Sequence, residues 1–194
     1  MRILFLGDVV GISGCLKIKN NLQSIIKREN INFVIVNGEN SAEPGVGLTE
    51  NICNDFFSCG VNVITSGNHV WDQKEIMTYI EKENRLLRPY NLLKNSPGKG
   101  FKVYKTINDM KIGVLNLMGN VFMKKCEDVF EVAHKFLNEH NLKKDYDFLI
   151  VDFHGEITSE KNAIGHFFDG KATLVIGTHT HIPTNDARVL KNGT

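Results

Sequence analysis

Two histidines lie in the segment Gly-Thr-His-Thr-His at residues 177–181, directly after an apolar run. Imidazole nitrogen is a common ligand for transition metals in proteins. In an extended segment, residues two apart point to the same side, so His179 and His181 are predicted to address one pair of metal ions. The threonine between them is predicted to face away.

Other polar clusters also follow apolar runs along the chain. Each cluster contains a side chain that could bind a metal ion through oxygen or nitrogen. With the two histidines above, the candidate ligands are Asp8, Glu39, Asn40, Asn68, His154, His179 and His181. His69 directly follows one of them and could move a proton, because an imidazole titrates near neutral pH.

The elements that must position these side chains alternate between short apolar runs and longer amphipathic stretches. The predicted strands are 2–7, 32–37, 61–66, 147–153 and 172–177, and the predicted helices are about 15–29, 49–59, 73–83, 127–140 and 158–168. This alternation predicts an α/β fold with a parallel or mixed sheet.

Two regions depart from that rhythm. Residues 101–107 and 111–117 are apolar runs joined by a short turn-like segment, which predicts a hairpin. A further strand is predicted to begin at about Ala187. The chain shows no internal repeat or linker, and its 194 residues suit a single domain over 1–194.

The candidate ligands are expected to converge, because the carboxyl ends of parallel strands meet at one edge of a sheet. A set of oxygen and nitrogen donors without cysteine suits iron, manganese or zinc, and the histidines argue against magnesium. Seven ligands exceed the need of one ion, so we expect two ions about 3.5–4 Å apart, bridged by a carboxylate. Two carboxylates and two divalent ions would leave a charge of about +2 to hold a phosphate.

Composition limits the classes of function. The formal net charge is +1, which gives no global field for nucleic acid or an anionic membrane. The four cysteines form no zinc-finger spacing and are predicted to be reduced thiols. No secretion signal and no apolar stretch of about 20 residues is present, so we expect a cytoplasmic protein without a membrane contact.

Each candidate ligand also has an ordinary structural interpretation. Asp8 could be a turn or cap residue, Glu39 and Asn40 could belong to a solvated loop, and His154 could be a satisfied core histidine. The metal-site hypothesis rests on the coincidence of such residues at five strand ends.

The motifs GD at 7–8, GEN at 38–40, GNH at 67–69, FH at 153–154 and GTHTH at 177–181 resemble those of the calcineurin-like metallophosphoesterases. Val10 stands where that superfamily has its first histidine, and GEN replaces an aspartate-containing block. Both departures resemble the YmdB-like family of bacterial 2',3'-cyclic-nucleotide phosphodiesterases, as do MRILFLGDVVG, GNHVWD, DFHGEITSEK and GTHTHIPTND. The resemblance runs over essentially the whole chain.

The resemblance implies the calcineurin-like metallophosphoesterase fold, with mixed β-sheets sandwiched between helices and a dimetal site at strand carboxyl ends. It also implies a ligand assignment. Glu39 would bridge the ions, with Asp8, Asn40 and His181 on one and Asn68, His154 and His179 on the other. Asn40 would take the place of the missing histidine, and iron is the first expectation for the metal, with manganese or zinc as alternatives.

The implied reaction is hydrolysis of a 2',3'-cyclic nucleotide such as 2',3'-cAMP or 2',3'-cGMP. A hydroxide held between the ions would attack phosphorus, and His69 would give a proton to the leaving oxygen. Asp72 could orient the His69 ring, or it could cap the helix that follows. Predicted substrate contacts are Arg88, Asn91, Lys99 and Thr158.

Family members run longer than this chain, so we expect it to lack the last part of the family's domain while keeping every candidate ligand. Members also carry Gly-Arg where this chain has Gly119-Asn120. The expected partners are a small nucleotide phosphodiester, RNA ends and further copies of the chain in a homo-oligomer.

Three alternatives were considered. The sequence leaves the first two open and argues against the third. The same site could serve a phosphomonoesterase or an RNA-processing nuclease. The chain could instead be a metal-bound regulatory protein with weak catalysis. The string SGNH at 66–69 suggests a lipase-like hydrolase, but those enzymes place their nucleophile in a Gly-Asp-Ser turn, and this chain has Gly7-Asp8-Val9.

Overall fold

The computed structural model describes residues 1–106 and 108–194 as an α/β protein. The described residues form two compact units. The first unit comprises residues 1–88 and 97–99, and the second comprises residues 89–96 and 100–194. The sequence-based assignment of a single domain stays a prediction.

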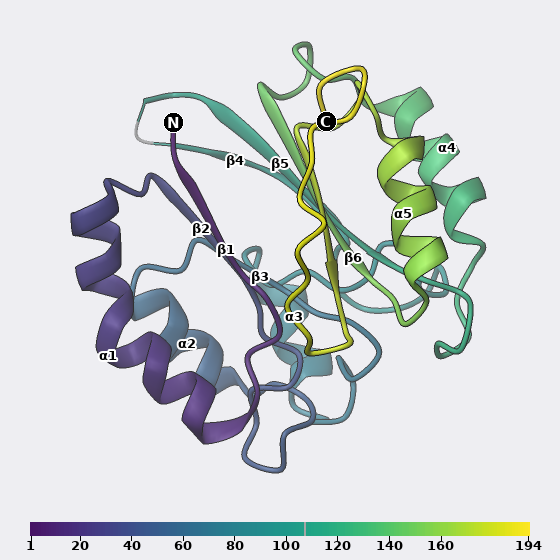
Figure 1. Ribbon diagram of the computed structural model, residues 1–194. Helices are drawn as coiled ribbons and strands as arrows, with labels where there is room; N and C mark the ends of the chain where they lie inside the picture. The colour runs from purple at the N-terminus through teal and green to yellow at the C-terminus, as the bar shows by residue number, and fades with distance from the viewer. Residues whose placement is uncertain (107) are drawn as a thin grey trace. The chain divides into compact units, whose positions relative to one another are not determined.

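The first unit is built on a three-stranded parallel sheet in the order β1-β2-β3 (Figure 1). Its strands are β1 (Ile3–Leu6), β2 (Phe33–Asn37) and β3 (Val63–Thr65). The central strand β2 is buried along its whole length, which explains its continuous apolar sequence. All three strands confirm the predicted ones to within two residues at either end.

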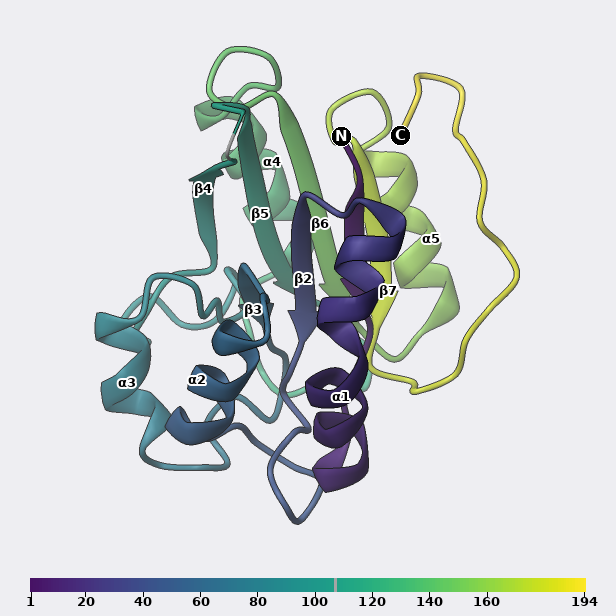
Figure 2. The ribbon, with the colours of Figure 1, turned by 90° about the vertical axis from the view of Figure 1, so that its left-hand side faces the viewer.

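The helices of the first unit are α1 (Gly11–Glu29), α2 (Glu50–Ser58) and α3 (Ile76–Lys82). Helices α1 and α2 cover one face of the parallel sheet (Figures 1 and 2). Helix α1 buries Ile18 and Leu22, which lie four residues apart on one helical face. It begins four residues earlier than predicted, at Gly11, whose φ of +57° suits glycine and whose N–H donates to the carbonyl of Asn40 at 2.8 Å.

The second unit contains a mixed four-stranded sheet in the order β4-β5-β6-β7. Its strands are β4 (Phe101–Lys105), β5 (Lys111–Met118), β6 (Phe148–His154) and β7 (Leu174–Thr178). Strands β4 and β5 are antiparallel and confirm the predicted hairpin, except that Ile107 lies outside the described residues. Strands β5, β6 and β7 are parallel.

Helices α4 (Val129–Glu139) and α5 (Thr158–Phe167) cover one face of this mixed sheet (Figures 1 and 2). The core beneath them includes the completely buried rings of Phe136, Phe153 and Phe168. Asp128 caps α4, because its side chain accepts from the N–H groups of Phe130 and Glu131 at 3.0 and 2.9 Å.

The strand predicted to begin at Ala187 is wrong. The segment after β7 contains no strand; residues 179–194 are all described. A strand needs a neighbour for its backbone groups, and this segment instead turns on itself: the N–H of Leu190 donates to the carbonyl of Thr194 at 2.8 Å. The Thr194 hydroxyl also donates to the carbonyl of Ala172 at 2.8 Å.

The predicted class, an α/β fold with parallel and antiparallel strands flanked by helices, is confirmed. Among the described residues, no helix combines the length and the apolar character that a membrane crossing requires.

Candidate active site

In the first unit, three polar clusters stand at the carboxyl ends of three parallel strands. Asp8 follows β1, Glu39 and Asn40 follow β2, and Asn68 and His69 follow β3. The strand ends are tied together, since Val9 N–H donates to the carbonyl of Asn37, and Gly38 N–H to that of Thr65, both at 3.0 Å. The parallel register therefore brings this half of the predicted site to one edge of the sheet.

Glu39 lies at the centre of this edge and is completely buried. One carboxylate oxygen, Oε2, accepts the backbone N–H of His69 at 3.0 Å, and the other, Oε1, accepts the side-chain amide of Asn40 at 3.4 Å. Burying a carboxylate is costly unless it is hydrogen-bonded, paired or bound to a metal. The two N–H donors stabilise the buried Glu39 carboxylate, and a metal cation would stabilise it further.

The proton-donor candidate is held in place by a neighbouring carboxylate. His69 Nδ1 lies 2.6 Å from Asp72 Oδ2. Helix α3 begins only at Ile76, after Glu75, so Asp72 does not stand at its start. Of the two roles left open for Asp72, the helix cap is not supported by the structure. The contact with Nδ1 is consistent with Asp72 orienting His69, which stays a prediction.

In the second unit, histidines follow two neighbouring parallel strands. His154 is the last residue of β6, and its ring meets that of His179 edge-on, with centroids 4.9 Å apart. His179 Nδ1 lies 3.1 Å from His154 Nε2, and His179 Nε2 lies 3.1 Å from Glu156 Oε2. His154 is completely buried.

The reasoning that placed His179 and His181 on one side of an extended strand is wrong. Strand β7 ends at Thr178, and the next residues turn. His179 has a φ of +102° and His181 a φ of +54°, which L-residues rarely adopt. Such backbone strain persists only where the surroundings impose it, and it clusters at functional sites. Within this unit, His179 lies against His154, and His181 is exposed.

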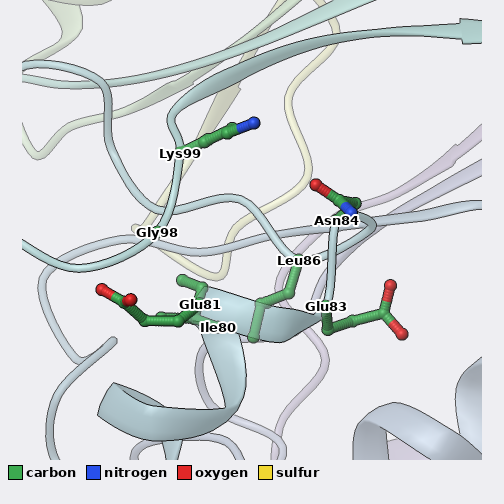
Figure 3. A pocket seen from close by; sticks show the side chains of 7 residues that line it. All are labelled: Ile80, Glu81, Glu83, Asn84, Leu86, Gly98 and Lys99. Carbon is green, nitrogen blue, oxygen red and sulfur yellow. The ribbon is translucent and has the colours of Figure 1, made fainter.

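The predicted substrate contacts have different surroundings. Arg88 is largely buried, and its Nε donates to the carbonyl of Pro97 at 3.1 Å. Lys99 is exposed and lines a cavity of about 230 Å³ together with Ile80 and Leu86 (Figure 3). Thr158 is exposed at the first position of α5. Their contact with substrate stays a prediction.

Asn91 has a structural role in the second unit. It is completely buried, its Nδ2 donates to the carbonyls of Met118 and Glu127 at 2.7 and 3.0 Å, and its Oδ1 accepts the N–H of Met118 at 2.9 Å. Contact between Asn91 and substrate stays a prediction. Such a contact would require Asn91 to give up its hydrogen bonds to Met118 and Glu127.

Asn120 fixes a loop in the second unit. Its Oδ1 accepts the N–H of Val129 at 2.9 Å, and its own N–H donates to Glu160 Oε1 at 2.8 Å. Glu160 is itself largely buried. This asparagine therefore supports the local backbone of the second unit.

Sequence reasoning missed Asp152, Thr178 and Glu156. The structure places all three beside the histidines of the second unit. A signal was present for Asp152, since residues two apart in a strand share a face and Asp152 precedes His154 by two in an otherwise apolar run.

The candidate donors of each unit, taken by itself, have the chemistry of transition-metal ligands. The first unit offers carboxylate and amide oxygen from Asp8, Glu39, Asn40 and Asn68, and the second offers imidazole nitrogen from His154, His179 and His181. Such mixed oxygen and nitrogen sets bind divalent iron, manganese or zinc.

Comparisons with known proteins agree with this chemistry. The family model described as YmdB-like protein matches residues 4–194. A curated 2',3'-cyclic-nucleotide 2'-phosphodiesterase of Bacillus subtilis is 43% identical over 194 residues, which cover 100% of this chain and 72% of that protein.

Two solved structures are also similar. A hypothetical protein from Thermus thermophilus has a TM-score of 0.90 at 36% identity, with 99% of this chain and 73% of that chain covered. A novel phosphatase from Mycoplasma pneumoniae has a TM-score of 0.89 at 39% identity, with 99% of this chain and 68% of that chain covered.

Proposed function

The chain belongs to the YmdB-like protein family, and from this premise we propose that it is a metal-dependent phosphodiesterase that hydrolyses 2',3'-cyclic nucleotides. The observation that carries the proposal is the curated Bacillus subtilis relative, a 2',3'-cyclic-nucleotide 2'-phosphodiesterase that matches this chain from end to end. The confirmed resemblance and the hydrolytic names of the relatives support an enzyme over a purely structural protein.

The proposal assigns two divalent ions to the residues of both units. Glu39 is the proposed bridge, with Asp8, Asn40 and His181 on one ion and Asn68, His154 and His179 on the other. Iron is proposed first, with manganese or zinc as alternatives, because the donors are oxygen and nitrogen without sulfur. When bound, divalent ions lower the pKa of water and neutralise charge on the phosphate.

The proposed role of His69 is to give a proton to the leaving oxygen of the nucleotide. Water supplies the new P–O bond, the bond from phosphorus to O2' breaks, and O2' takes the proton from His69 Nε2, leaving a 3'-phosphate. Asp72 supports this role at 2.6 Å from Nδ1, since it holds the ring and stabilises the protonated imidazole before transfer. The backbone N–H of His69 donates to Glu39 Oε2, so the proposed proton donor is held next to the proposed bridging carboxylate.

The direct test joins elemental analysis and turnover on one preparation. We expect about two transition-metal ions per chain and hydrolysis of 2',3'-cAMP to 3'-AMP, followed by chromatography. Removal of metal with a chelator should abolish turnover, and added Mn²⁺ or Fe²⁺ should restore it. A metal-loaded chain that leaves 2',3'-cAMP intact would contradict the proposal.

Parallel substrates separate the alternatives. Faster hydrolysis of a plain phosphomonoester would favour a phosphatase, and cleavage of a short RNA would favour a nuclease acting on RNA ends. Metal binding without hydrolysis of any diester would favour a regulatory protein.

Three further expectations belong to the proposal. A cytoplasmic location is supported by the four free cysteine thiols, because disulfides are rare in that compartment. The second expectation is that the chain assembles into a homo-oligomer. The third is that four residues contact the substrate: Arg88, Asn91, Lys99 and Thr158.

A further inference from the structure

We propose that Asp152 and Thr178 are positioning residues that fix the tautomer of His154 and thereby direct its Nε2 to a metal ion. The inference rests on the proposed function for the identity of His154 as a ligand. It concerns residues of the second unit alone, on the adjacent strands β6 and β7.

The three side chains form a connected series within that unit. Thr178 stands opposite His154 in the parallel register, and Asp152 lies two residues before His154 on the same face. Thr178 Oγ1 lies 2.7 Å from Asp152 Oδ1 and 2.9 Å from His154 Nδ1. Asp152 and His154 are completely buried and Thr178 is 4% exposed, so solvent does not compete for these bonds.

The number of hydrogens that Thr178 and His154 can donate determines the direction of the two hydrogen bonds. The Thr178 hydroxyl donates its single hydrogen to Asp152 Oδ1. The hydroxyl then presents a lone pair to His154, and Nδ1 must supply the hydrogen. A neutral imidazole with hydrogen on Nδ1 carries its lone pair on Nε2.

A second contact is consistent with this assignment. His154 Nε2 lies 3.1 Å from His179 Nδ1, which can donate a hydrogen to an unprotonated Nε2. The ring of His154 is therefore held with Nδ1 toward the core and its accepting nitrogen toward the other histidine. A ligand histidine needs such an outer partner to fix its ring and tautomer, and losing one typically costs about 10–100-fold in metal affinity.

The discriminating pair of variants is Thr178→Val and Thr178→Ser. Valine keeps the shape of threonine and removes the acceptor of Nδ1–H, whereas serine keeps the hydroxyl and removes a methyl group. We expect Thr178→Val to weaken metal binding about 10–100-fold in a chelator competition. Thr178→Ser should stay close to the parent. Thermal unfolding of both variants reports any loss of folding separately.

The tautomer itself is measured by long-range ¹H–¹⁵N NMR of the histidine rings in the full chain after metal is removed. The parent and Thr178→Ser should show His154 with hydrogen on Nδ1, and Thr178→Val should show that preference lost. Asp152→Ala removes the acceptor of the Thr178 hydroxyl, so it should also shift the tautomer. The inference is overturned if folded Thr178→Val keeps both the tautomer and the metal affinity of the parent.

Failure of the proposed function looks different. The NMR measurement needs neither metal nor substrate, so it tests the Asp152–Thr178 series by itself. A parent chain that shows the Nδ1–H tautomer but hydrolyses no diester would contradict the function and leave the tautomer assignment standing.

Discussion

The two units provide different candidate metal donors, here called the oxygen half and the imidazole half, and each unit positions its own donors differently. The first unit offers oxygen donors from loops that directly follow three parallel strands, with Glu39 bonded to the backbone N–H of the next loop. The second offers imidazoles, held through the Asp152–Thr178 pair and by backbone at positive φ at His179 and His181.

The difference reflects what each donor needs. A carboxylate binds a metal in several orientations, so parallel strand ends and short loops suffice to position it. An imidazole binds through one nitrogen along one direction, and it must carry its hydrogen on the other nitrogen. The histidine half therefore requires outer hydrogen-bond partners and an imposed backbone conformation.

The largest effect is expected at the centre of the oxygen half. Glu39→Gln removes the charge of the proposed bridge while keeping its shape. We expect loss of bound metal in elemental analysis and a fall in turnover of at least about 10⁴-fold, because metal ions contribute several kcal/mol to such transition states. Glu43→Gln, an exposed residue in the same loop, is the matched control and should keep both. Full metal content in the Glu39 variant would show that the oxygen half does not depend on this carboxylate.

The next effect separates proton transfer from metal binding. His69→Ala should keep its metal and lower kcat about 10²–10³-fold, because general acid catalysis contributes in this range. The exposed His166 provides the control His166→Ala, with parental turnover expected. Asp8→Ala and His179→Ala, by contrast, should lose bound metal in addition to turnover. Unchanged turnover of 2',3'-cAMP by the His69 variant would disprove its role as the acid.

A smaller effect is expected when His69 is kept but the carboxylate that holds its ring is replaced. Asp72→Asn keeps the size of the side chain but no longer stabilises a protonated His69 across the 2.6 Å contact. We expect kcat to fall about tenfold with metal content unchanged, because the His69 ring loses the carboxylate that holds it. A parental kcat in the Asp72 variant would argue that Asp72 does not act through His69.

The smallest effect is expected at the thiols, since neither half uses cysteine. Burial, followed by the nearby charge of Glu160, raises the pKa of Cys126 to about 11. The thiol is neutral below that pH, so at a pH of about 7.5 its alkylation by iodoacetamide should be roughly two orders of magnitude slower than that of free cysteine. Peptide mass mapping would measure the rate, which should rise as the pH approaches the pKa. Labelling of Cys126 as fast as free cysteine would contradict this assignment.

The sequence anticipated the oxygen half better than the imidazole half. Asp8, Glu39, Asn40 and Asn68 were found from their position after apolar runs, and the structure places them after parallel strands as expected. The strand predicted from Ala187 and the extended conformation at His179 were wrong. Both errors assumed regular extended backbone. The chain instead turns between Leu190 and Thr194, and His179 has a positive φ.

Two local ambiguities also required coordinates. Asp72 could cap a helix or orient His69, and the start of α3 at Ile76 shows only that Asp72 does not stand at the start of that helix. Asn91 was predicted to reach substrate, but bonds to the backbone of Met118 and Glu127, far along the chain, occupy its amide.

What the sequence by itself determined was the alternation of strands and helices, the type of each candidate metal donor and its place at a strand end. These follow from hydrophobic periodicity and from the chemistry of side chains, which are local properties. Tertiary structure alone decided the Asp152–Thr178–His154 series and the turn at His179. Both depend on which strands become neighbours, and that choice is made by packing between residues more than twenty positions apart.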